Sequence, residues 1–269
     1  MEIIEILKAF ILGIVQGITE WLPISSTGHL IIIEDIFKFN FPEAFVNTFF
    51  VIIQLGSILA VVVLFFNKLN PIKRDKEERN KIINLWLKIA VASVPAAIIG
   101  FVFGDKIDEL LYNSVTVAIM LIIYGVIFIV LERGHRKPNV DDLGQISYKL
   151  AIGIGVFQML ALIPGTSRSG ATIVGAIFLG TSRYIASEFS FFLAIPTMLG
   201  ASAYKLLKMG FAFTNLEWMV LLVGSVTAFV VSLWVINFLL DYVRKYDFKI
   251  FGYYRIILGL IVLFFYLFL

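Results

Sequence analysis

Six long apolar runs constrain this chain more than any other feature, because each is long enough to cross a bilayer core, which takes about 20 helical residues. They are Thr48–Phe66, Asn84–Gly104, Ser114–Leu131, Ala186–Tyr204, Glu217–Leu240 and Phe251–Leu269. Apolar residues of the AVILMFWYC set make up 60% of the 269 residues, whereas an ordinary soluble domain has roughly 45–50%. The sequence therefore predicts an all-α polytopic membrane protein with six transmembrane helices. The absence of cysteine excludes thiol catalysis and thiolate metal sites.

Two further apolar regions are interrupted by proline. The first runs from the N-terminus to Leu22, meets Pro23 and resumes at Leu30–Phe37. The second covers residues 148–163 and 170–180, on either side of Pro164. The arms after the prolines are too short to cross a membrane, and a broken helix at membrane depth needs protein or a water-filled cavity to receive its backbone groups. Each region is therefore predicted to form a re-entrant helical hairpin.

The two interrupted regions resemble each other. In each, a glutamine precedes the proline, a Ser/Thr/Gly cluster follows it, and three of the long apolar runs come after the cluster. A hairpin returns the chain to its own side and three spans move it across, so the second copy must be inverted relative to the first. We predict a single integral-membrane domain, 1–269, made of inverted repeats of about 1–132 and 145–269. Such repeats mark binding sites near the midplane.

The placement of positive charge predicts the orientation. Of the 22 Lys and Arg residues, 14 fall in the loops 67–83, 132–149, 181–185 and 241–250, and five fall on the opposite side. Cytoplasmic loops carry the excess of Lys and Arg, so we expect the first set to face the cytoplasm. Both termini and the mouth of the first hairpin would then face outward. The N-terminus has no basic region or small-residue cleavage site, so we expect no cleaved signal peptide.

The hairpins carry a polar minority that suits phosphate chemistry. A helix N-terminus behind a Gly/Ser turn attracts anions, and the intramembrane Arg168 offers a bidentate fork for phosphate oxygens. Gln16 and Glu20 share one helical face and present the hard oxygens that Mg²⁺ or Ca²⁺ prefers. A histidine such as His29 or a hydroxyl such as that of Ser26 can attack phosphorus or transfer protons.

Each of these features also has a purely structural explanation. Serine and threonine after a proline are commonly helix caps. Glu20 and Arg168 would also suit an ion pair that only holds the hairpin tips together, and His29 would also suit a hydrogen-bonded core position. His135, in a basic loop, is expected to be a solvated residue.

The two hairpin sequences resemble the signatures of a known family, the undecaprenyl-diphosphate phosphatases that are linked to bacitracin resistance. The matching segments are residues 17–30, GITEWLPISSTGHL, and residues 161–172, ALIPGTSRSGAT. The resemblance covers the whole chain. It implies interdigitated inverted repeats with a site that opens to the outer face, and a divalent cation, Mg²⁺ or Ca²⁺. It also implies hydrolysis of the C55 polyprenyl diphosphate to its monophosphate, which recycles the lipid carrier of cell-wall synthesis.

The resemblance also implies roles for individual residues. Glu20 and Gln16 would handle the metal or water, although glutamine at position 16 brings one charge fewer than the glutamate of many relatives. His29 and Ser26 are rival candidates for the nucleophile or the acid/base group, and Arg168 would hold the diphosphate. The remaining residues would line the substrate: Ser25, Thr27, Ser167, Ser169 and Thr172.

Two alternatives share parts of this pattern. Phosphatases of the phosphatidic-acid-phosphatase type need a second histidine six residues after the arginine, where this chain has Val174. A transporter or flippase of a lipid phosphate or other anion remains the main alternative, because inverted repeats with broken helices are typical of transporters. The expected partners are the polyprenyl diphosphate and the bilayer, with no nucleic acid, and the sequence leaves a homodimer open.

Overall fold

The structure is a computed structural model that describes residues 2–72, 75–134, 137–209 and 213–268. These residues form helices joined by loops, with one isolated bridge between Val140 and Thr181 and no strand in the described ranges. The all-α prediction is confirmed. His135 lies outside the described residues.

Within the described residues, six helices are long and apolar enough to cross a membrane, as predicted. They are α3 (Glu43–Leu64), α5 (Lys76–Leu111), α6 (Ser114–Leu131), α9 (Arg183–Met209), α10 (Asn215–Val243) and α11 (Lys249–Phe268). Most are longer than the apolar runs, because the helices continue through polar residues at their ends. At the start of α5, for example, the side chain of Asp75 caps the helix by accepting a hydrogen bond from the backbone of Glu78. A short helix, α4 (Phe66–Leu69), follows α3.

The two interrupted regions are broken helices, as predicted. The first consists of α1 (Glu2–Thr19) and α2 (Ser26–Phe37), and the second of α7 (Tyr148–Met159), the 3-10 turn η2 (Leu160–Leu162) and α8 (Arg168–Phe178). Another 3-10 turn, η1 (Leu143–Gln145), precedes α7. The arms after the prolines begin earlier than predicted, at Ser26 rather than Leu30 and at Arg168 rather than Gly170. The reason is that the serine before each arm caps it. That these broken helices are re-entrant, and that they enter the membrane from opposite sides, stays a prediction.

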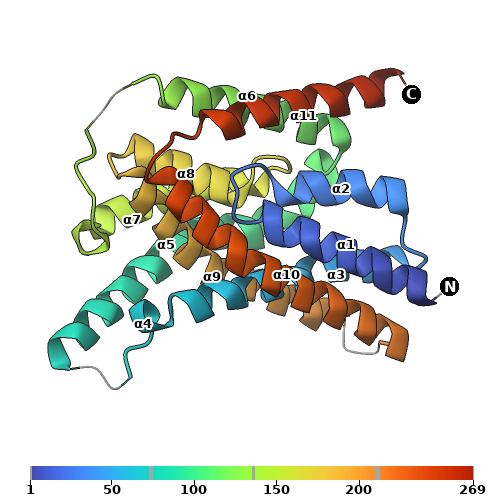
Figure 1. Ribbon diagram of the computed structural model, residues 1–269, viewed down its shortest axis with the longest axis horizontal. Coiled ribbons are helices and arrows are strands. Elements are labelled where there is room, and N and C mark those ends of the chain that lie inside the picture. The colour runs from blue at the N-terminus through green and yellow to red at the C-terminus, as the bar shows by residue number, and fades with distance from the viewer. Residues whose placement is uncertain (1, 73–74, 135–136, 210–212, 269) are drawn as a thin grey trace.

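Each hairpin packs against a span from the other half of the chain (Figure 1). Helix α1 packs along α10, and its counterpart α7 packs along α5; α6 pairs with α11, and α3 contacts α9. The contact of α1 with α10 and that of α7 with α5 are both very close. A Cβ on Gly13 would lie 2.6 Å from Gly224 O of α10, and one on Gly155 would lie 2.2 Å from Ala92 O of α5. Small residues allow such approach between membrane helices. The exchange of partners supports the predicted inverted repeat, which stays a prediction.

Helix α9 is the central helix of the bundle. In the apolar, membrane-spanning stretch of α9, 72% of the residues are buried inside the protein, whereas the corresponding share in α5 is 28%. The ends of α3, α6 and α10 that lead into the Lys- and Arg-rich loops lie toward the left of Figure 1, whereas the start of α1 and the end of α11 lie toward the right. The basic loops and the termini are therefore at opposite ends of the molecule.

Candidate active site

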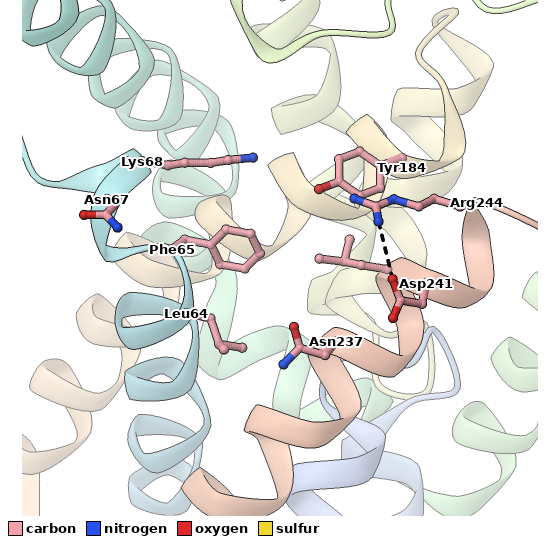
Figure 2. A pocket seen from close by; sticks show the side chains of 9 residues that line it. Leu64, Phe65, Asn67, Lys68, Tyr184, Asn237, Asp241 and Arg244 are labelled. Atoms are coloured by element: carbon pink, nitrogen blue, oxygen red, sulfur yellow. Dashed lines mark hydrogen bonds and ion pairs between the residues drawn. The ribbon is translucent and has the colours of Figure 1, made fainter.

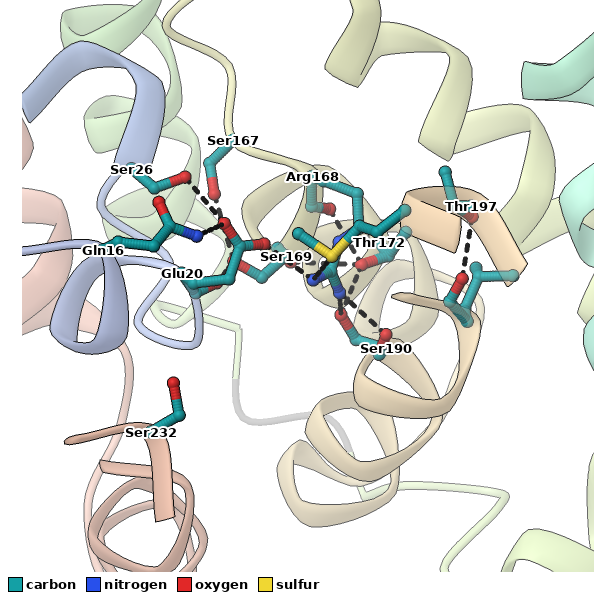
Figure 3. A network of polar contacts seen from close by, with 12 residues as sticks. Gln16, Glu20, Ser26, Ser167, Arg168, Ser169, Thr172, Ser190, Thr197 and Ser232 are labelled. Atoms are coloured by element: carbon teal, nitrogen blue, oxygen red, sulfur yellow. Dashed lines mark hydrogen bonds and ion pairs between the residues drawn. The ribbon is translucent and has the colours of Figure 1, made fainter. Parts of the chain in front are cut away.

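Glu20 is the point at which the two hairpins meet. It follows the last turn of α1, and its Oε2 accepts hydrogen bonds from the Gln16 amide, at 3.0 Å, and from the Ser26 hydroxyl, at 2.8 Å. Its Oε1 accepts a hydrogen bond from Nη2 of Arg168, at 2.9 Å, and the pair is an ion pair. Figure 3 shows this network between the first hairpin and α8. Four of the predicted site residues are thus in direct contact.

Arg168 is the first residue of α8 and is held from several sides. Its Nη1 donates to Ser190 O of α9 at 2.8 Å, and its guanidinium lies 5.6 Å from the centre of the Trp21 ring. The side chains of Arg168 and Glu20 are only 11% and 4% exposed, so this ion pair is poorly screened by solvent. The Nε of Arg168 is buried and has no hydrogen-bond partner within the described residues. One donor of the guanidinium is therefore unsatisfied in this structure.

The serine before the second arm of each hairpin has the same backbone conformation. Ser25 and Ser167 have φ of 77° and 75°, in the left-handed region that non-glycine residues seldom adopt. Each hydroxyl accepts a hydrogen bond from the backbone N–H three residues later, that of Gly28 or Gly170. In this structure both predicted substrate-binding residues are helix caps. Strained positions of this kind cluster at functional sites and persist only where the surroundings hold them.

The other predicted substrate-binding residues support the contact between the hairpins. The Ser169 hydroxyl donates to Glu20 O at 3.2 Å, which ties the start of α8 to the end of the first hairpin's entry arm. The Thr172 hydroxyl donates to Arg168 O and shares a 2.7 Å hydrogen bond with the Ser190 hydroxyl. Thr27 lies in α2, and its side chain is outside the described part of the structure.

His29 lies apart from this network. Its Nδ1 is 2.7 Å from Ser25 O, and its Nε2 is 2.6 Å from the hydroxyl of Tyr254 in α11. Since a carbonyl oxygen only accepts, Nδ1 carries the hydrogen, and in the neutral ring Nε2 accepts from the tyrosine. The two rings are parallel, with centres 5.6 Å apart. The structure thus brings Glu20, Ser26 and Arg168 together, whereas the His29 ring hydrogen-bonds Ser25 and Tyr254, which are outside that group.

The predicted metal ligands offer few free oxygen atoms. Gln16 Oε1 is buried without a hydrogen-bond partner, which suits an incoming cation, but both oxygens of Glu20 already accept hydrogen bonds. Among the described residues no group of three or more His, Cys, Asp or Glu side chains is close enough to hold a metal. Gln16 and Glu20 therefore fit only a cation that takes its other ligands from water and substrate. Mg²⁺ is commonly bound in this way, through one or two carboxylates and substrate phosphates.

Sequence reasoning missed three residues of the site: Ser190, Tyr254 and Arg255. Arg255 had a clear signal, because it is a charged residue within a predicted span, the same criterion that singled out Arg168. Ser190 lies in the apolar run Ala186–Tyr204, but nothing in the sequence pairs it with an arginine. Tyr254 carries no signal, because tyrosine is common at the ends of membrane helices.

A pocket of about 330 Å³ lies elsewhere, at the end of α3, the start of α9 and the end of α10 (Figure 2). Lys68, Tyr184, Asp241 and Arg244 line it, together with apolar residues such as Phe65. The Arg244 guanidinium lies 4.6 Å from the centre of the Tyr184 ring and pairs with Asp241. None of the predicted site residues lines this pocket, which belongs to the end of the molecule with the basic loops.

Known proteins match the chain over almost its full length. A protein named undecaprenyl-diphosphatase 1 from Clostridioides difficile (strain 630) is 61% identical over 264 residues, which cover 97% of this chain and 96% of that protein. A protein named undecaprenyl-diphosphatase from Enterococcus faecalis is 56% identical over 269 residues, which cover 98% of each chain. The family described as "Bacitracin resistance protein BacA" matches residues 9–261. The resemblance of the two hairpin motifs is confirmed, and the chain belongs to the BacA family.

Proposed function

We propose that this chain is an integral-membrane phosphatase that hydrolyses undecaprenyl diphosphate to the monophosphate and inorganic phosphate. The observation that carries the proposal is the contact of the Ser26 hydroxyl and the Arg168 guanidinium with the two oxygens of one carboxylate, that of Glu20. A hydroxyl held by a base, beside a cation suited to phosphate, is the arrangement that phosphoryl transfer requires. The names of the relatives agree with this activity.

In the proposed mechanism Ser26 is the nucleophile. Its Oγ attacks the terminal phosphorus, its proton passes to Glu20, and the bond from that phosphorus to the bridging oxygen breaks. Undecaprenyl phosphate then leaves and takes the proton from Glu20 on that oxygen. The regenerated Glu20 carboxylate deprotonates a water whose oxygen attacks the phosphorus on Ser26. The bond from phosphorus to Ser26 Oγ breaks, the proton returns to Oγ, and inorganic phosphate leaves. The 2.8 Å hydrogen bond between Ser26 and Glu20 supports Ser26 rather than His29 as the nucleophile. The Nε2 of His29 already accepts a hydrogen bond from the hydroxyl of Tyr254.

Arg168 would bind the phosphate oxygens and stabilise the charge that develops on them. Its unpartnered Nε and its position at the start of α8 support this role, since a helix N-terminus adds free N–H groups and a favourable dipole. Gln16 and Glu20 would hold a divalent cation, Mg²⁺ or Ca²⁺, together with diphosphate oxygens. When bound, the cation would neutralise charge on the diphosphate.

Hydrolysis also accounts for the site better than transport does. A carrier needs groups that bind an anion, but it has no use for a hydroxyl poised on a carboxylate. The contact between Ser26 and Glu20 therefore favours an enzyme over the transporter or flippase alternative. The sequence leaves a homodimer open, and the absence of nucleic-acid binding stays a prediction.

Phosphate release by the purified protein tests the function. In detergent micelles with Mg²⁺ or Ca²⁺, we expect release of phosphate from a C55 diphosphate but not from the monophosphate. Removing the cation with EDTA should lower the rate by at least about tenfold, because a metal ion supplies several kcal/mol of charge stabilisation. Monodisperse, thermally stable protein that releases no phosphate would rule out the enzyme. Full activity in EDTA would exclude a role for the divalent cation but would leave the proposed hydrolysis standing.

The orientation of the protein gives a further prediction. We propose that both termini and the active site face outward, because the basic loops gather at the opposite end of the molecule. A reporter fused after Leu269 that works only outside the cytoplasm should be active, and one inserted in the 67–83 loop should be inactive. The reverse pattern would mean that the site opens to the cytoplasm.

A further inference from the structure

Arg255 of α11 is a fully buried arginine that bonds to the turns of both hairpins. Its Nη1 donates to Pro23 O at 3.0 Å, and its Nη2 donates to Gly165 O at 2.8 Å and to Thr166 O at 3.0 Å. Weaker contacts of 3.4 Å reach Leu121 O and Met120 O of α6. One guanidinium therefore joins two turns that are far apart in the sequence and that precede the two halves of the active site.

These bonds fix the backbone from which the catalytic side chains project. The carbonyl of Thr166 belongs to the same planar, trans peptide as the N–H of Ser167, so a donor that holds this carbonyl also directs that N–H to the opposite side. Ser167 has φ of 75° and is followed directly by Arg168. On the other hairpin, the Pro23 carbonyl lies three residues before Ser26. Arg255 thus holds both turns in the conformation that brings Ser26 and Arg168 to Glu20.

The acceptors of Arg255 are all backbone carbonyls. No carboxylate among the described side chains forms an ion pair with it. A buried charge without a charged partner is costly and persists where the surrounding polar groups are arranged for it. The fork of a guanidinium can bond several carbonyls at once, whereas the compact ammonium of a lysine cannot span the same set. The shape of the side chain, and not only its charge, is therefore required.

We infer that Arg255 is a positioning residue of the phosphatase, which ties the Pro23 turn to the Gly165–Thr166 turn and so keeps Ser26 and Arg168 in register on Glu20. It touches neither the substrate nor the reacting atoms. The inference rests on the proposed hydrolytic function, but the tie between the hairpins is a structural property that can be measured separately.

The test compares Arg255→Lys and Arg255→Gln with the wild-type protein. Because a displacement of about 1 Å at a catalytic group can cost about a hundredfold, we expect kcat to fall by about that factor in both variants. KM should change little, since Arg168 still binds the phosphate. Arg244→Gln, which removes a half-exposed arginine at the other end of the molecule, should leave both constants unchanged.

A distance measurement separates positioning from a general loss of structure. The chain has no cysteine, so spin labels can be attached to Ile18→Cys and Phe178→Cys, one exposed site on each hairpin. In an otherwise wild-type background the distribution of label-to-label distances should be narrow, and each Arg255 variant should broaden or shift it. Arg244→Gln should not.

Three results would overturn the inference. The first is Arg255→Lys with kcat within threefold of wild type and an unchanged distance distribution. The second is a loss of activity that equals the loss of folded protein, so that the folded fraction keeps full specific activity. That result would show a purely structural role. The third is low kcat with unchanged distances. If Arg255→Gln does not fold, Arg255→Lys decides. Inactive wild-type protein would contradict the proposed function, and the label distances would still test the tie between the hairpins.

Discussion

Replacing Arg168 with alanine is expected to lower kcat/KM for the C55 diphosphate by about a thousandfold or more. An arginine that stabilises the transition state of phosphoryl transfer typically contributes a factor of this size. The variant loses the donors to the phosphate and the partner of Glu20 at the same time. Steady-state phosphate release measures the effect, and Arg168→Lys, which keeps the charge but not the fork, should recover only part of the activity.

Stability has to be measured alongside activity, because the loss of Arg168 leaves the Glu20 carboxylate buried without an ion-pair partner. Breaking such a pair from one side costs about 3–5 kcal/mol. The pair of Arg183 and Glu132 supplies a matched control, since it also joins two distant segments but lies outside the site. Arg183→Ala should reduce thermal stability and keep the specific activity of the folded protein. If Arg168→Ala behaves in the same way, the ion pair is structural.

Replacing Ser26 with alanine is the second change with a large expected effect. We expect kcat to fall by about a thousandfold or more with KM nearly unchanged, because a nucleophile acts in the transition state and contributes little to substrate binding. Among the described residues the Ser26 hydroxyl hydrogen-bonds only Glu20, so the cost of the substitution to stability should be about 1 kcal/mol.

The order of effects among neighbouring variants tests the assignment. Ser169→Ala removes a hydroxyl of the same size, bonded to a backbone carbonyl of Glu20, and should reduce kcat far less than Ser26→Ala. His29→Gln should also have the smaller effect, because the ring of His29 hydrogen-bonds Ser25 and Tyr254 rather than Glu20. A larger loss in His29→Gln than in Ser26→Ala would contradict the assignment of Ser26 as the nucleophile.

Much of the fold could be predicted because the apolar runs report directly on membrane spans. The prolines at 23 and 164 and the short arms after them also located the two broken helices. The helix ends were less predictable, since capping by Ser25 and Ser167 extends α2 and α8 toward the turns. Hydropathy detects the part of a helix that matches the hydrocarbon core, whereas polar residues and caps decide where the helix ends.

The candidate site was predictable within each hairpin but not between them. Gln16 and Glu20 are four residues apart on a helix, so their contact follows from spacing alone. The contact of Glu20 with Arg168 depends on how α1 packs on α10 and how α8 packs on α9, which no local pattern specifies. The same is true of Tyr254, which reaches His29 from α11. Contacts between distant segments are the part of the site that required a structure.

The most direct test of the mechanism is to identify the residue that carries phosphate during turnover. Wild-type protein would be mixed with C55 diphosphate labelled on its terminal phosphorus, quenched within milliseconds in acid or in base, and mapped by mass spectrometry. A phosphoserine survives acid and a phosphohistidine survives base, so the two quenches detect either product. We predict acid-stable label on Ser26, and base-stable label on His29 would contradict the proposed mechanism.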